Sequence, residues 1–182
     1  SAGAGDEFAF EGPGVRRLTA EEFYDAIGSL TGVWQVNPRF ELPSGMDSGE
    51  RVRAWRVPLD PLSRALGRTV RERVTTRRET AGTTMQALEL SNGGTLDEHL
   101  RRGAEKLLAD AELSGPELVD LLFWRGLQRA PDADELAISL QLLQGDTEAS
   151  AEASADASHL SQAGLEDLLW SLCMLPEFQL IR

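Results

Sequence analysis

The chain has 182 residues, of which 41% are hydrophobic, and its formal net charge is −12 at pH 7. This length and apolar content suffice for a buried core, so we expect one domain over residues 16–182, preceded by a flexible segment at residues 1–15. No apolar run approaches the roughly 20 residues that cross a bilayer, and the single cysteine, Cys173, excludes an internal disulfide and any multi-cysteine metal or haem site.

Most of the elements that the sequence predicts are helices. Five begin at a Ser, Thr or Asp with a Glu or Gln three residues later, a capping box in which the two residues satisfy free backbone N–H groups reciprocally. These boxes predict helices over about 19–31, 83–90, 95–111, 114–127 and 132–143, and an apolar stripe at 165–172 predicts a last helix that ends before Pro176. A short helical turn is expected at 61–66, with Asp60 as its cap.

Two of these helices have distinctive apolar patterns. The helix at 83–90 carries Met85, Leu88 and Leu90, whereas the helix at 114–127 carries apolar side chains around most of its circumference. We therefore expect the helix at 114–127 to be central and buried.

Two segments do not fit a helical pattern. Prolines and glycines across residues 35–60 predict an irregular arm, which we expect to pack Trp55 onto the helices. The small, polar and acidic side chains of "GDTEASAEASADAS", residues 145–158, predict a mobile linker. Because strands are almost absent, the predicted fold is all-α, an array of about six helices.

Arginine is concentrated in the stretch "GRTVRERVTTRRET" at residues 67–80, which holds Arg68, Arg71, Arg73, Arg77 and Arg78. The simpler interpretation is a structural clamp, in which guanidinium groups contact helix carboxylates and backbone carbonyls. The alternative is an outward-facing surface that holds an anionic partner, such as an acidic polysaccharide or an acidic surface of another domain. Nucleic acid is not an expected partner, because the acidic C-terminal half would repel it and no known reader motif is present.

No residue is assigned a catalytic, cofactor-binding or metal-binding role. His99 and His159 have no partner at metal-ligand spacing, and His99, next to the capping residue Glu98, is expected to be solvated or associated with the helix cap. Trp34 and Trp55, in or beside the arm, are the candidate surface platforms on which a sugar ring could stack. Trp124, Trp170 and Cys173 lie in apolar helices and are expected in the core.

Several segments together resemble a known family. They are "RRLTAEEFYDAIGSLTG", "ALGRTVRERVTTRRETAGTTMQALELSNGGTLDEHLRRGAEKL", "ELVDLLFWRGLQRAPDADELAISLQLL" and "LEDLLWSLCMLPEFQLIR". Their order and spacing resemble the C-terminal, PSD-type domain of unknown function in planctomycete cytochrome-c-associated proteins, over residues 16–182.

The resemblance implies an exported, periplasmic or cell-surface, multidomain parent protein with a cytochrome-c-like domain upstream, and it brings no catalytic residues. We accordingly expect a noncatalytic module that docks other domains of its parent. The alternative is a polysaccharide-binding or polysaccharide-degrading domain with a groove lined by the five arginines, Trp34 and Trp55.

Overall fold

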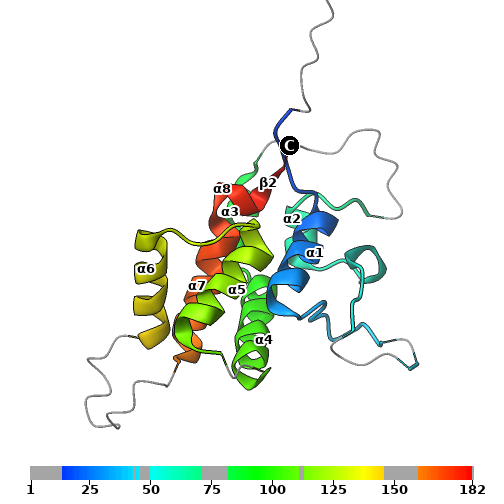
Figure 1. The fold of residues 1–182 in the computed structure, drawn as a ribbon. Coiled ribbons are helices and arrows are strands. Elements are labelled where there is room, and N and C mark those ends of the chain that lie inside the picture. The colour runs from blue at the N-terminus through cyan, green and yellow to red at the C-terminus, as the bar shows by residue number, and fades with distance from the viewer. Residues whose placement is uncertain are drawn as a thin grey trace, which may run out of the picture.

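The structure, a computed structural model, describes residues 14–42, 44–45, 50–70, 82–110, 113–145 and 160–181. The elements, in chain order, are β1 (Arg16–Arg17), α1 (Ala20–Thr31), the 3-10 turn η1 (Ala54–Arg56), α2 (Pro61–Ala65), α3 (Thr84–Asn92), α4 (Gly94–Asp110), α5 (Gly115–Leu127), α6 (Ala133–Gln144), α7 (Gln162–Met174), α8 (Pro176–Gln179) and β2 (Leu180–Ile181) (Figure 1). The predicted all-α fold is confirmed, with one two-stranded sheet in the described ranges. Within the same ranges no helix is both long and apolar enough to cross a bilayer.

Local capping explains where several helices begin. Thr19 and Glu22 cap α1 reciprocally, with the Glu22 N–H donating to Thr19 Oγ1 at 3.3 Å and the Thr19 N–H donating to Glu22 Oε2 at 2.8 Å. Asp132 caps α6 in the same way. The box predicted at Thr95 is wrong, because α4 already begins at Gly94, immediately after α3.

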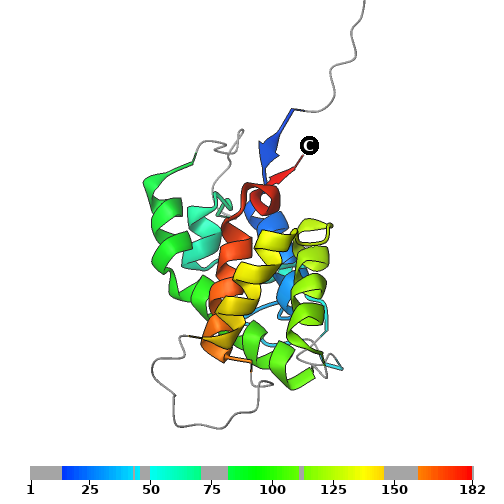
Figure 2. The same ribbon diagram turned by 60° about the vertical axis from the view of Figure 1, so that its left-hand side comes forward.

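The core is built around α7, which packs against α4, α5, α6 and α8, while α1 packs against α4 and α5. Figure 2 shows α6 and α7 side by side. The prediction of α5 as a fully buried central helix is only partly right. Leu118, Val119, Leu122 and Phe123 are buried, but Trp124 is half exposed.

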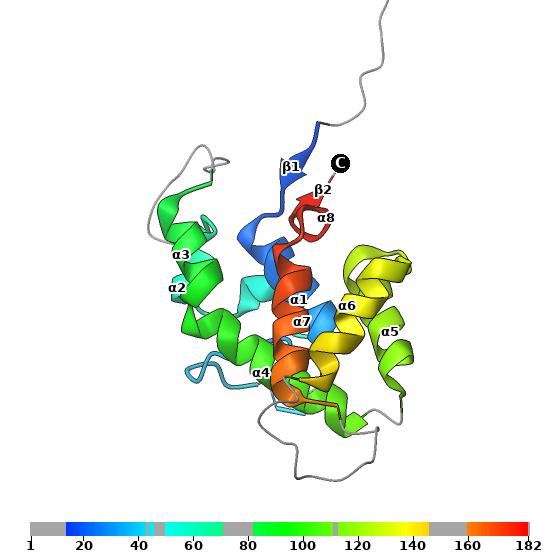
Figure 3. The same cartoon turned by 90° about the vertical axis from the view of Figure 1, so that its left-hand side faces the viewer.

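The two ends of the described fold lie together. β1 pairs antiparallel with β2, with Arg16 opposite Ile181 and Arg17 opposite Leu180, and the Leu18 N–H donates to the Gln179 carbonyl at 2.9 Å. Figure 3 shows β1, β2 and α8 gathered at one end of the molecule. The expected flexible segment at 1–15 and the expected linker at 145–158 fall almost entirely outside the described residues.

The arm enters the core through small apolar side chains, Val36, Val52, Ala54 and Val57. The prediction that Trp55 packs onto the helices is wrong, because 67% of this residue is exposed. η1 instead attaches to α1 through polar contacts at one carboxylate. Asp25 accepts from the Ala54 N–H at 3.1 Å and pairs with Arg53 at 2.9 Å.

Candidate functional site

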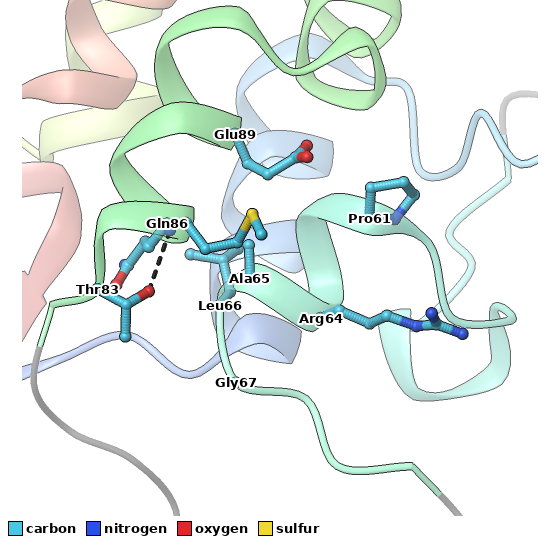
Figure 4. A pocket seen from close by; sticks show the side chains of 9 residues that line it. Pro61, Arg64, Ala65, Leu66, Gly67, Thr83, Gln86 and Glu89 are labelled. Carbon is cyan, nitrogen blue, oxygen red and sulfur yellow. Dashed lines mark hydrogen bonds between the residues drawn. The ribbon is translucent and has the colours of Figure 1, made fainter.

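A hollow of about 430 Å³ lies between α2 and α3 (Figure 4). We call it the α2–α3 groove, and its lining residues are Pro61, Arg64, Ala65, Leu66, Gly67, Thr83, Met85, Gln86 and Glu89. One wall comes from the short helix α2, which Asp60 caps by accepting from the Ser63 N–H at 2.8 Å. The other comes from the start of α3, where the Gln86 N–H donates to Thr83 Oγ1 at 3.1 Å.

The α3 helix leaves most of its apolar surface exposed. Leu90 is its one buried residue, whereas Met85 is 60% and Leu88 55% exposed. Figures 2 and 3 both show α3 at the edge of the molecule, on the side opposite α5. Exposed large apolar side chains beside a hollow are typical of a surface that contacts another molecule.

The rim of the groove continues onto β1. Arg17 Nη1 donates to Gln86 Oε1 at 3.4 Å, which brings this end of the chain against the start of α3. Val15, two residues earlier in the same extended segment, is also exposed. The groove and its rim therefore combine side chains from α2, α3 and the start of the described chain.

The arginines near the groove have different roles. Arg68 is mostly buried, with Nε 3.8 Å from Glu21 Oε1 and Nη2 donating to the Trp55 carbonyl at 3.0 Å, so it ties the end of α2 to α1 and η1. Arg64, in contrast, is exposed and has no ion-pair partner within the described part of the chain. Arg68 is placed as a clamp would be, whereas Arg64 lines the groove and extends its side chain away from α3 (Figure 4).

Of the other residues proposed from the sequence, none that the structure describes lines this groove. Arg71, Arg73, Arg77 and Arg78 lie outside the described residues. Trp34 packs against Gly28 of α1, with the Arg51 guanidinium 5.0 Å from its ring centre. The exposed ring of Trp55 has the Arg56 guanidinium 5.9 Å away. The structure thus places Trp34 against α1 and leaves Trp55 exposed beside Arg56.

A second hollow, of about 420 Å³, lies on the other side of Pro61 and is lined by Asp60, Thr95, Glu98 and residues of the arm. Behind it His99 is completely buried, so the prediction of a solvated His99 is wrong. The position of His99 in the sequence indicates its burial, because His99 lies three residues after Leu96 and one before Leu100, within the apolar stripe of α4.

Tyr24 contacts both His99 and Asp60. The ring planes of Tyr24 and His99 meet edge to face at 5.5 Å, and the Tyr24 hydroxyl donates to Asp60 Oδ1 at 2.5 Å. Neither ring nitrogen of His99 has a hydrogen-bond partner, although the Val33 backbone is near enough to favour the charged ring weakly. Burial lowers the pKa of His99 to about 4, and burial together with the Asp60 charge raises the pKa of Tyr24. His99 is therefore neutral at pH 7.

Metal binding finds no support in this geometry, since the described residues contain no group of three or more His, Cys, Asp or Glu side chains arranged to hold an ion. Cys173 is buried as predicted, and burial raises the pKa of its thiol to about 12. The thiol is therefore protonated at neutral pH.

The comparison with known proteins identifies a family. The family model of PSD1, described as a protein of unknown function (DUF1553), matches residues 5–143, well over half of the chain. No curated protein and no solved structure matches the chain.

Proposed function

We propose that this chain, which belongs to the PSD1 family of unknown function, is a noncatalytic interaction module that docks another domain of its parent protein at the α2–α3 groove. The observation that carries the proposal is the exposure of Met85 and Leu88 beside the hollow. A helix that packs only for its own stability buries such side chains, because each contributes about 1.5–3 kcal/mol when fully buried. Their exposure leaves that free energy available to a partner.

The charge around the groove indicates the chemistry of the partner. The chain carries a net charge of −12, yet the groove presents Arg64 without an ion-pair partner in the described residues, and Arg17 lies at the rim. Glu89 is the one carboxylate among the lining residues. We therefore expect a segment with an apolar anchor and neighbouring carboxylates, which would place the anchor against Met85 and its charges near the arginines.

The test is binding between the chain and the upstream part of its parent protein, expressed as a separate polypeptide and titrated by calorimetry. Met85→Asp places a charge in the apolar contact and is expected to weaken binding at least tenfold. Ile138→Asp is the matched control, because Ile138 on α6 is 61% exposed, comparable to Met85, and does not line the groove. Equal effects of the two substitutions, or no binding by the unmodified chain, would contradict the proposal.

A second candidate function, binding of an acidic polysaccharide, rests on Trp55. Its exposed ring beside Arg56 offers a stacking face and a cation, which together suit a sugar that carries a carboxylate. Electrophoresis through a gel containing polygalacturonate measures such binding as retardation. Trp55→Ala is expected to abolish the retardation and Trp124→Ala, on the half-exposed tryptophan of α5, to leave it unchanged. If both variants are retarded like the unmodified chain, Trp55 does not bind the polysaccharide.

A further inference from the structure

The most unusual buried group in the described part of the chain is the imidazole of His99. It is fully buried, and both of its ring nitrogens lack a hydrogen-bond partner. A buried polar group without a partner typically costs about 1–3 kcal/mol, whereas a leucine of similar size would avoid that cost. A residue that costs stability in this way is a candidate for a functional role.

The neighbours of His99 come from four parts of the chain. Tyr24 lies on α1, the Val33 backbone follows the end of α1, Asp60 caps α2, and Glu98 and Arg102 lie on α4 with His99 itself. Among the charged groups, Asp60 acts most strongly on the ring and favours its protonated form. Glu98 acts less, and its carboxylate is already paired with two guanidinium groups of α4.

Asp60 is also the residue that joins these parts of the chain. Its carboxylate accepts from the Tyr24 hydroxyl on α1 and from the Ser63 N–H at the start of α2. A cation formed at His99 needs a carboxylate or water, because an isolated charge is very unfavourable in an apolar environment. A ring that moves toward Asp60 competes with the Tyr24 hydroxyl and the Ser63 N–H, which both donate to Asp60 Oδ1, and a ring that moves toward water must leave its pocket.

We infer that His99 is an acid-sensitive switch: its protonation releases α2 from α1 and α4. The inference holds whatever the α2–α3 groove binds, although α2 forms one wall of that groove. The proton comes from solvent and adds to a ring nitrogen, so no bond is broken apart from the hydrogen bonds around Asp60.

The difference between the pKa of a solvated histidine and that of the buried His99 sets how strongly acidification favours opening. A solvated histidine has a pKa near 6.5, and burial lowers that of His99 to about 4. Acidification from pH 7.5 to pH 5 therefore favours any state in which the ring is solvated, by a factor of about 30.

Hydrogen exchange of the full chain, corrected for the intrinsic effect of pH, tests the inference. Between pH 7.5 and pH 5 the exchange of residues 60–66 is expected to accelerate about 30-fold and to stay faster than that of α7. In His99→Leu the acceleration is expected to disappear. Acceleration that persists in this variant would overturn the inference. Equal rates in residues 60–66 and in α7 would overturn it as well, because they would mean that the whole fold opens.

A titration of the unmodified chain tests the inference without relying on the folding of His99→Leu. The two imidazoles are followed by NMR, and His159→Gln assigns the signals. We expect His99 to titrate near pH 4 while the core remains folded. A midpoint near 6.5 would show that its ring is already solvated and would overturn the switch.

Discussion

Gly164 provides the sharpest test of how α6 and α7 pack. A Cβ atom built at this position would lie only 1.8 Å from the Leu142 carbonyl oxygen and 2.7 Å from the carbonyl carbon. The backbone cannot relieve a clash by changing rotamer as a side chain can, so Gly164→Ala must push the end of α6 away from the start of α7. The Ser161 N–H donates to the Leu143 carbonyl at 2.8 Å in the same place, and this bond is expected to be strained too.

Overpacking typically costs about 1–3 kcal/mol, and here we expect the upper end because neither side of the contact is a flexible side chain. The higher helix propensity of alanine relative to glycine offsets at most about 1 kcal/mol of this cost. The free energy of unfolding should therefore fall by about 2 kcal/mol, which lowers Tm by roughly 4–8 °C for a chain of this size.

Urea unfolding followed by circular dichroism measures the change, with Gly126→Ala as the matched control. Gly126 lies in α5, and the atom nearest to a Cβ added there would be Leu30 Cδ1, at 3.4 Å. The control is expected to be stabilised by about 0.5–1 kcal/mol. If Gly164→Ala is as stable as Gly126→Ala, then α6 and α7 do not approach each other as closely as described.

Three further substitutions test other contacts. Arg129 donates to Glu135 and holds the pKa of that carboxyl at about 2 in the folded state, so the contribution of this contact to stability is present above pH 4.5 and is lost as the pH falls toward 2. The urea midpoints of Arg129→Gln and of the unmodified chain should therefore converge over that interval. A constant difference between the two midpoints would contradict this. Gly28→Ala puts a Cβ 2.5 Å from Trp34 Cε3, and a red shift of the tryptophan fluorescence should report the displaced indole, whereas an unchanged spectrum would refute the contact. Leu122→Ala in the core should cost about 2–5 kcal/mol by thermal unfolding, and a loss below 1 kcal/mol would place this residue outside the core.

The helices were predictable because their signals are local. The Thr19 and Asp132 boxes hold in the structure because each needs only residues within one turn. The Thr95 box failed for an equally local reason. Its acidic member, Glu98, pairs with Arg101 and Arg102 one turn further along, and α4 begins before Thr95.

The candidate site was not predictable from local patterns. Its walls, α2 and α3, are separated by residues 66–83, and no local pattern indicates that they lie together. The exposure of Met85 depends on which helices cover α3, just as the burial of His99 depends on α1 and the arm packing over α4. Helical periodicity identifies an apolar face but not whether another element covers it.

The pairing of β1 with β2 has a mechanical consequence. Arg16 lies opposite Ile181, so a pull applied to residue 14 and residue 181 from outside loads the two-residue ladder at its open end. Under such tension the hydrogen bonds break one after another, and the helices carry load only after the ladder has opened. Flanking domains would then strain this ladder first, and an optical trap with handles at those two positions should record a small extension at low force before the core unfolds. A single unfolding step would show that the ladder bears load together with the helices.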